Sequence, residues 1–123
     1  VAKKVLVVDD DKGCSDLYKI RFEIAGYEVS VAYSAEQAID MLKEAKPDVI
    51  LLDLMLPEMQ GDELLKRLRE NKATAKIKVV LLTALNLNPE KYAEICKLAD
   101  GCLLKIEVLP KDLVKKVDSL LDH

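Results

Sequence analysis

The stretch VILLDLMLPEMQG, from Val49 to Gly61, decides the fold predicted for this chain. Its first four residues are apolar and rich in strand formers, and they are too few for the core of a helix. Such a run is typical of a strand that is buried on both faces of a parallel sheet. The run ends at Asp53, and a loop that contains Pro57 follows. Because an unpartnered carboxylate at the end of a buried strand is costly, we expect Asp53 to have a function.

Length and composition indicate one compact domain. The chain has 123 residues, of which 50% are hydrophobic and 33% are charged, with four glycines and four prolines. We interpret residues 1–123 as a single domain, either a stand-alone protein or a piece of a longer chain. The net charge of −3 gives no reason to expect direct binding to nucleic acid. No apolar run approaches the roughly 20 residues of a membrane span, so membrane insertion is not expected.

The three cysteines, Cys14, Cys96 and Cys102, are an odd number and lack the spacing of metal ligands. This usage favours reduced thiols in an intracellular, cytoplasmic setting. Cys14 and Cys96 are expected to be small core residues.

Predicted strands and helices alternate on both sides of the central stretch. Further strands are expected at 5–8, 27–32, 78–82 and 102–104. Helices are expected over 14–25, 35–45, 62–70 and 89–98, and from Pro110 onward. Ser34 with Gln37 forms a capping box, and Asn88 with Pro89 forms a second helix start. In the first helix the main apolar face is expected to contain residues 14, 17, 18, 24 and 25.

This alternation predicts a doubly wound α/β domain. Its five strands would form a parallel sheet with helices on both faces, connected by right-handed crossovers.

Polar residues directly follow four of the five predicted strands. They are Asp9 with Asp10, Asp53, Thr83 and Lys105. Because all strands of a parallel sheet point the same way, we expect these residues to gather at its carboxyl edge. Open α/β sheets bind their ligands at that edge.

A group of carboxylates at one edge predicts a bound cation. Two unit charges about 4 Å apart repel by on the order of 4 kcal/mol at an effective dielectric constant near 20. Oxygen-only ligands at a half-open site suit Mg²⁺. With Lys105 and the Thr83 hydroxyl beside it, the edge is suited to hold a tetrahedral anion next to the metal. The chain has no Gly-rich phosphate loop, so we favour a phosphoryl group attached to Asp53 itself.

These motifs resemble the receiver domain of two-component response regulators. The resemblance rests on VLVVDDD (5–11), DVILLDLMLPEMQGDELL (48–65), VVLLTAL (79–85) and the strand that ends at Lys105, and it covers essentially the whole chain. It implies a flavodoxin-like strand order of 2-1-3-4-5. It also implies a signalling phosphoacceptor, not an enzyme that releases a product.

By this resemblance, Asp53 accepts a phosphoryl group from the phosphohistidine of a sensor histidine kinase or a histidine phosphotransfer protein. That partner would dock near the first helix. Asp10 and Asp53 would bind Mg²⁺ together with the backbone carbonyl of Met55, and Asp9 would help through water. The changed surface would act on a downstream protein or output domain that the sequence does not identify.

The resemblance also assigns roles around the phosphoryl group. Thr83 and Lys105 would hold its oxygens, and the small Ala84 would leave room for it. Gly61 would take the turn that precedes the third helix.

The chain departs from the family pattern at several positions. Cys102 stands where an aromatic residue is usual, three residues before the lysine, so the usual inward movement of a ring is not available. Ile106 stands where proline usually follows the lysine, which puts the cis peptide expected there in doubt. Met55 and Leu85 are apolar at positions where polar residues can orient an attacking water. This favours slow hydrolysis of the aspartyl phosphate.

Two other functions are compatible with parts of the sequence. Asp9 and Asp11 have the D-x-D spacing of a haloacid-dehalogenase-type phosphatase, in which Asp9 would be the nucleophile, but Gly13 replaces the expected Thr or Val. The departures at Cys102 and Ile106 also fit a receiver-like protein-binding module that works without phosphorylation.

Overall fold

The computed structural model describes residues 2–83 and 88–122. In this part of the chain the strands are β1 (Lys4–Val8), β2 (Glu28–Ala32), β3 (Val49–Asp53), β4 (Lys78–Thr83) and β5 (Gly101–Leu104). The α-helices are α1 (Lys12–Ile24), α2 (Ala35–Glu44), α3 (Gly61–Glu70), α4 (Pro89–Cys96) and α5 (Pro110–Leu121). A short 3₁₀ helix, η1 (Lys105–Glu107), follows β5.

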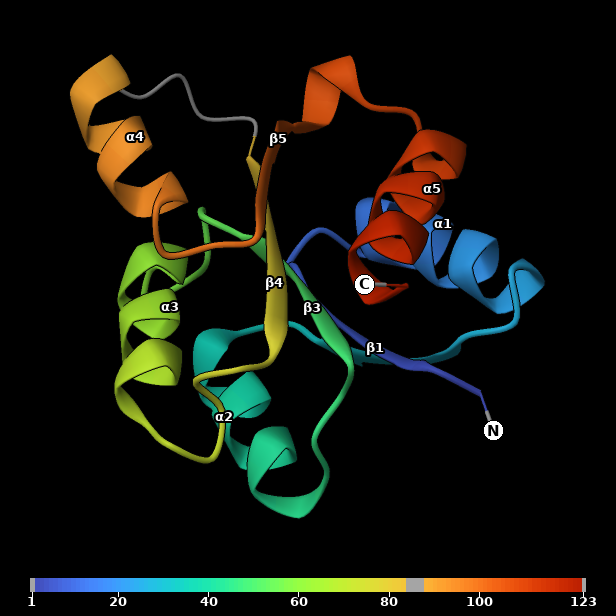
Figure 1. Ribbon diagram of the computed structural model, residues 1–123, viewed down its shortest axis with the longest axis horizontal. Coiled ribbons are helices and arrows are strands. Elements are labelled where there is room, and N and C mark those ends of the chain that lie inside the picture. The colour runs from blue at the N-terminus through green and yellow to red at the C-terminus, as the bar shows by residue number, and fades with distance from the viewer. Residues whose placement is uncertain (1, 84–87, 123) are drawn as a thin grey trace.

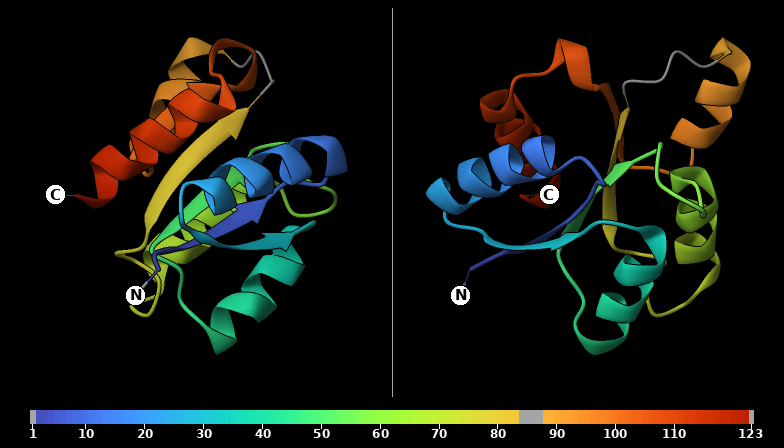
Figure 2. Two further views of the ribbon diagram at one scale, coloured as in Figure 1. Left: turned by 90° about the vertical axis from the view of Figure 1, so that its right-hand side faces the viewer. Right: turned by 180° about the vertical axis from the view of Figure 1, so that it is seen from behind.

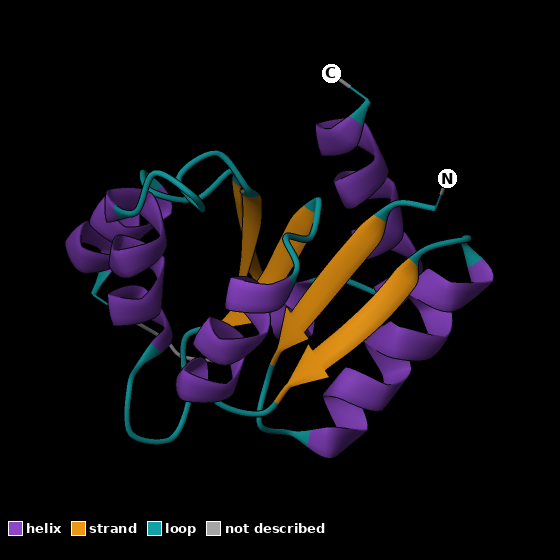
Figure 3. Cartoon of the chain, turned by 90° about the horizontal axis from the view of Figure 1, so that it is seen from below, coloured by secondary structure: helices purple, strands orange, loops and turns teal. Residues whose placement is uncertain are grey.

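The strands form one parallel sheet in the order β2-β1-β3-β4-β5, which confirms the predicted fold class and strand order. Helices α1 and α5 cover one face, whereas α2, α3 and α4 cover the other (Figure 1). Figure 3 shows the helices flanking the sheet on either side. The result is the three-layer arrangement expected when strands and helices alternate.

The central strand β3 is buried along its whole length and divides the core into two parts. Ile50 and Leu52 pack in the cluster that contains the buried residues of α2 and α3. Val49 and Leu51 pack in the cluster formed with α1 and α5. Because successive side chains of a strand point to opposite faces, an unbroken apolar run supplies both clusters at once.

Local signals account for most of the element ends. Asp11 and Ser34 cap α1 and α2, and each accepts a hydrogen bond from a backbone N–H three residues later, at 3.2 and 3.1 Å. The side chain of Asn88 accepts from the backbone N–H of Glu90 at 2.9 Å at the start of α4. Gly26 follows α1 with φ of 96°, a left-handed conformation that glycine adopts without strain.

The prediction for the buried face of α1 is wrong for Leu17, Ile24 and Ala25, whereas Tyr18 is buried as expected. The helix buries Ser15, Tyr18 and Phe22, whereas Leu17 and Ile24 are 47% and 73% exposed. Burial of the two large aromatic side chains sets the rotation of the helix. Phe22 packs edge-to-face on Tyr27 with ring centroids 5.2 Å apart, so the smaller aliphatic residues turn to the surface.

Arg69 of α3 joins this helix to the segments that lead into β4 and β5. Its guanidinium donates to the carbonyls of Ala75, Ile77 and Leu98 at 2.7–2.9 Å and to the Asp100 carboxylate at 3.0 Å. Asp100 also accepts from the backbone N–H of Val79 at 2.8 Å. One planar side chain thus fixes the approaches to β4 and β5 against α3.

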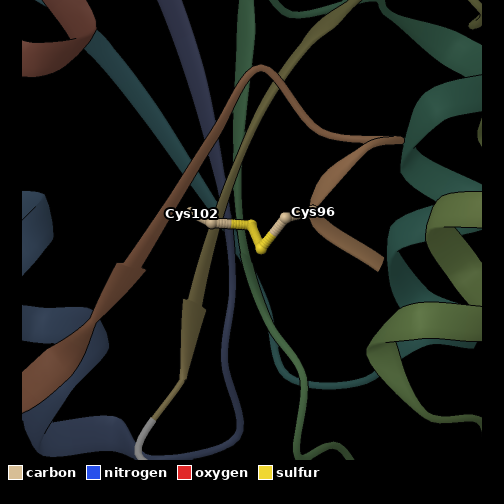
Figure 4. The surroundings of a disulfide bond; sticks show 2 residues. All are labelled: Cys96 and Cys102. Carbon is tan, nitrogen blue, oxygen red and sulfur yellow. A yellow bond between two sulfur atoms is a disulfide. The ribbon is translucent and has the colours of Figure 1, made fainter. Parts of the chain in front are cut away.

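Cys96 and Cys102 form a disulfide, with Cα atoms 5.8 Å apart (Figure 4). The prediction of reduced thiols is therefore wrong for this pair, and Cys96 is a half-buried bridge residue instead of a core thiol. Cys14 is a free thiol of intermediate burial. The α4–β5 turn brings the paired cysteines together, and spacing alone did not reveal it.

The two ends of the chain lie at the amino-terminal edge of the sheet. Lys3 Nζ is 3.0 Å from the Asp122 carboxylate. The strand arrows point away from both termini, toward the carboxyl edge (Figure 2). Asp9, Asp10, Asp53, Thr83 and Lys105, predicted from the sequence to be functional, belong to that opposite edge.

Candidate functional site

Five of the residues predicted for the site lie at or just after the carboxyl ends of their strands. Asp9 and Asp10 follow β1, Asp53 ends β3, Thr83 ends β4, and Lys105 follows β5. Pairing of β3 with β4 places Asp53 opposite Leu82, beside Thr83. Ala84 and Leu85 lie outside the described residues.

Three carboxylates converge at this edge. Asp9, Asp10 and Asp53 each offer an oxygen, and these oxygens lie within 4.8 Å of one another. Asp9 and Asp53 are only 2% and 6% exposed, whereas Asp10 is exposed. The loop holds its shape because the Asp9 carboxylate accepts from the backbone N–H of Asp11 at 2.9 Å.

Lys105 joins the two buried carboxylates. Its Nζ atom donates to Asp9 at 2.7 Å and to Asp53 at 2.9 Å. Burial lowers the pKa of the Lys105 ammonium, but these two hydrogen bonds outweigh that effect and raise the pKa above its ordinary value. The lysine is therefore charged at neutral pH and partly neutralises the acidic edge.

Asp53 combines burial with hydrogen bonds to both carboxylate oxygens. One oxygen accepts from Lys105, and the other accepts from the backbone N–H of Met55 at 3.0 Å. Burial raises the pKa of the Asp53 carboxyl above its ordinary value, although both hydrogen bonds act in the opposite direction. An ionised Asp53 at this depth therefore gains from any further positive charge nearby.

Gly61 allows α3 to begin directly over the end of β3. A Cβ atom on Gly61 would lie 2.3 Å from the carbonyl oxygen of Asp53 and 2.8 Å from the Cα of Leu54. The Gly61 N–H also donates to the Leu54 carbonyl at 2.9 Å. The residue is required for close backbone approach, which is a different reason from the turn that the sequence suggested.

The donor set fits a hard divalent cation. Carboxylate oxygens from two neighbouring strand ends converge, one of them is exposed to solvent, and the Met55 backbone is held beside Asp53 by its N–H. Mg²⁺ prefers such oxygen ligands and keeps several waters. The described residues thus offer what the predicted Mg²⁺ site needs.

The structure reveals surface features that the sequence interpretation missed. Leu17, Ile20 and Ile24 form an exposed apolar stripe on α1. Their spacing of three and four residues is the signal that could have identified it. Ile106, at the usual proline position, is exposed in η1, and no cis peptide bond occurs among the residues that the structure describes.

Within residues 2–83 and 88–122, every helix is too short or too polar to cross a bilayer.

Two curated transcriptional regulators are similar in sequence. The chain is 39% identical over 102 residues to the DNA-binding dual master transcriptional regulator RpaA of Synechocystis, covering 83% of this chain and 42% of that protein. It is 35% identical over 121 residues to the phosphate regulon transcriptional regulatory protein PhoB of Pseudomonas aeruginosa, covering 98% and 52%. The chain thus spans about half the length of these relatives.

Solved structures with the same fold cover nearly all of the chain. A response regulator from Chloroflexus aurantiacus superposes with a TM-score of 0.90 at 31% identity, and the match covers 100% of both chains. The chemotaxis response regulator CheY4 of Vibrio cholerae gives a TM-score of 0.88 at 31% identity, covering 98% of this chain and 100% of that one.

The family comparison agrees with the acidic edge of the sheet. Residues 5–118 match the response regulator receiver domain family, and this range contains every residue predicted for the site. The chain therefore belongs to the receiver domain family of response regulators, which fits a phosphoacceptor role in two-component signalling.

Proposed function

We propose that Asp53 accepts a phosphoryl group from the phosphohistidine of a sensor histidine kinase or a histidine phosphotransfer protein. The observation that carries this proposal is the position of the Asp53 carboxylate. It lies at the end of the central strand, 2.9 Å from Lys105 and in the same cluster as Asp9 and Asp10. A carboxylate at a polar edge of this kind is a suitable nucleophile for phosphoryl transfer.

The transfer forms one bond and breaks another. An oxygen of Asp53 attacks phosphorus, the phosphorus–nitrogen bond of the phosphohistidine breaks, and its electron pair stays on the imidazole. Lys105 binds oxygens of the transferred group, because its charge lies beside the attacking carboxylate. The hydroxyl of Thr83, at the end of the adjacent strand, donates to a further oxygen. The product is an acyl phosphate on this chain. The phosphoryl group therefore stays attached and is not released as the product of an enzyme would be.

We assign the Mg²⁺ ligands to Asp10, Asp53 and the backbone carbonyl of Met55, with Asp9 acting through water. When bound, Mg²⁺ supplies positive charge that offsets repulsion between the carboxylates and the phosphoryl oxygens. Lys105 alone supplies a single charge to a cluster of three carboxylates.

The apolar stripe on α1 is the proposed docking surface for the phosphohistidine partner. Leu17, Ile20 and Ile24 are 47%, 55% and 73% exposed, and α1 begins directly after the acidic loop. An exposed stripe at helical spacing suits packing against helices of a partner. We place this encounter in the cytoplasm, without membrane insertion or nucleic acid contact by this domain. The downstream partner or output domain is not identified.

The D-x-D phosphatase alternative has less support. Asp11, its second aspartate, caps α1 by accepting from the backbone N–H of Cys14 at 3.2 Å. Lys105 contacts both Asp9 and Asp53, so Asp9 is not distinguished as the nucleophile.

Incubation with acetyl phosphate and Mg²⁺ tests the proposal. Intact-protein mass spectrometry should show the gain of one phosphoryl group in the native chain and in an Asp40→Asn control, whose carboxylate is exposed on α2. The gain should disappear in Asp53→Asn. A gain that persists in Asp53→Asn but disappears in Asp9→Asn would favour the phosphatase chemistry. A native chain that gains no mass would favour a module that works without phosphorylation.

A further inference from the structure

The disulfide connects α4 to β5. Cys96 is the last residue of α4, and Cys102 is the second residue of β5, opposite Leu81 of β4. Figure 4 shows the bond crossing directly from the helix to the strand. Both cysteines are only partly buried, so the bond is not enclosed in the core.

Few other side chains hold α4 against the sheet. Of its eight residues, only Ile95 is buried. By contrast, α3 on the same face buries four residues (Figure 1). Because apolar burial supplies most of the attachment of a surface helix, the disulfide is a major part of what holds α4 in place.

The turn between α4 and β5 has anchors of its own. The backbone N–H of Asp100 donates to the Val79 carbonyl at 2.8 Å, and Arg69 donates to the Leu98 carbonyl at 2.7 Å. These contacts do not involve either sulfur. They would keep the two cysteines near each other after reduction, which favours reoxidation of the same pair.

We propose that Cys96 and Cys102 form a reversible redox site that sets how firmly α4 is attached to β5. In the oxidised protein α4 is covalently tied to the strand, and in the reduced protein it is held mainly by Ile95. In a reducing compartment, disulfides are commonly transient and redox-sensing.

The reaction needs a dithiol reductant. A thiolate of the reductant attacks one sulfur, the bond between Cys96 and Cys102 breaks, and a mixed disulfide forms. The second thiol of the reductant then displaces that cysteine. The two electrons and two protons end on the cysteine thiols, and the reductant leaves as its own disulfide.

A consequence for signalling rests on the proposed function. Cys102 lies on β5 three residues before Lys105, the proposed ligand of the phosphoryl group. The disulfide therefore joins α4 to the strand that immediately precedes this lysine. In the oxidised form, a displacement of β5 on phosphorylation reaches α4 through covalent bonds. In the reduced form, this covalent link is absent and only the turn between α4 and β5 connects them.

Hydrogen exchange measured by mass spectrometry tests the attachment. Adding dithiothreitol to the native chain should speed exchange in α4 by about tenfold, while β3 remains protected. Cys102→Ser should show the fast α4 exchange without reductant, and the matched control Cys14→Ser should respond to reductant as the native chain does. Unchanged α4 exchange on reduction would overturn the proposal. An equal increase in β3 would also overturn it, because the disulfide would then stabilise the whole fold.

Alkylation under denaturing conditions provides a second test that does not depend on any variant. Protein treated with a mild oxidant and then unfolded should carry one alkylated cysteine, Cys14, and after reduction it should carry three. Three alkylated cysteines after the oxidant would overturn the redox site.

Beryllofluoride with Mg²⁺ separates this inference from the proposed function. A change in α4 exchange that occurs in the oxidised form and is lost on reduction supports the coupling, whereas the same change in both forms overturns it. If beryllofluoride leaves every segment unchanged, the proposed phosphoacceptor chemistry fails. The redox control of α4 attachment is then decided by dithiothreitol alone.

Discussion

Gly61 illustrates how a residue without a side chain can be required by the backbone around it. The start of α3 lies so close to the end of β3 that a Cβ atom would be 2.3 Å from the Asp53 carbonyl oxygen. Neither backbone segment can yield easily, because β3 is the buried central strand and α3 packs on it through Leu64 and Leu65. The same glycine therefore contributes to the position of the proposed nucleophile.

Gly61→Ala is expected to lower the free energy of unfolding by about 1–3 kcal/mol, because the added methyl group forces a shift of backbone atoms. Gly101→Ala is the matched control. The nearest atoms to its Cβ would be those of the flexible Lys116 side chain and of Val80, at 3.4–3.8 Å. Urea unfolding monitored by circular dichroism compares the two variants. Equal stability of both would contradict the steric explanation.

Met55 and Leu85 give a prediction about the lifetime of the phosphorylated state. The Met55 side chain is exposed beside the site and has no group that could orient an attacking water. Leu85 is equally apolar, although it lies outside the described residues. We expect the aspartyl phosphate to decay about tenfold more slowly than in a Met55→Asn, Leu85→Glu variant. Loss of the phosphorylated mass at 25 °C measures the rates. Identical decay in the two proteins, or decay as fast as in chemotaxis receivers, would contradict the prediction.

Much of the candidate site could be predicted at the level of residues because position along a strand determines position in space. Asp53 and Thr83 end neighbouring buried runs, so a parallel sheet places them side by side. The contacts of Lys105 could not be predicted from strand position in this way. Its bonds to Asp9 and Asp53 span 96 and 52 residues and depend on how the loop after β5 turns back.

At the scale of elements, the strands and helix starts could be predicted because their signals are local. The apolar run of β3 and the caps at Ser34 and Asn88 need no information from distant residues. The buried face of α1 could not be predicted in the same way. Competition between aliphatic and aromatic residues for one core decides it, and Phe22 takes the buried position while Ile20 is exposed.

The ion pair between Arg69 and Asp100 is a long-range contact that local sequence signals do not predict. They are separated by 31 residues and meet only after α3, β4 and β5 have assembled. The disulfide has the same origin, because Cys96 and Cys102 face each other through the turn that this ion pair anchors. The sequence suggested reduced cysteines, whereas the topology joins Cys96 and Cys102 to each other.

Arg69→Lys is expected to lower the free energy of unfolding by about 1–3 kcal/mol, because an ammonium cannot replace a planar fork that reaches four acceptors. Arg67→Lys on the same turn of α3 is the control. Arg67 makes an exposed ion pair with Glu63 at 3.7 Å, so its change should stay within about 0.5 kcal/mol. The midpoints of urea unfolding of the two variants measure the loss of stability in each. Similar midpoints would mean that Arg69 has no special anchoring role.

At the scale of the whole molecule, the two edges of the sheet have different electrostatic properties. At the amino-terminal edge, Lys3 and Asp122 form an exposed ion pair of the kind that contributes little to stability. At the carboxyl edge, three carboxylates converge and Lys105 pairs with two of them, Asp9 and Asp53. Folding therefore brings Asp53 to Asp9 and Asp10, from which it is separated in the unfolded chain. A cation bound there should stabilise the fold as a whole, because the ligands come together only in the folded state.

Mg²⁺ is accordingly expected to raise the free energy of unfolding of the native chain by about 1.4 kcal/mol at ten times its Kd. Asp53→Asn should show a smaller rise, because it removes one proposed ligand. The exposed Asp40→Asn should respond as the native chain does. Thermal unfolding with and without Mg²⁺ measures the effect, and NaCl at matched ionic strength shows how much of it is screening.

If NaCl reproduced the whole rise, or if Asp53→Asn kept it, the carboxyl edge would not bind Mg²⁺ as proposed. The gain would then reflect general relief of repulsion in a chain of net charge −3.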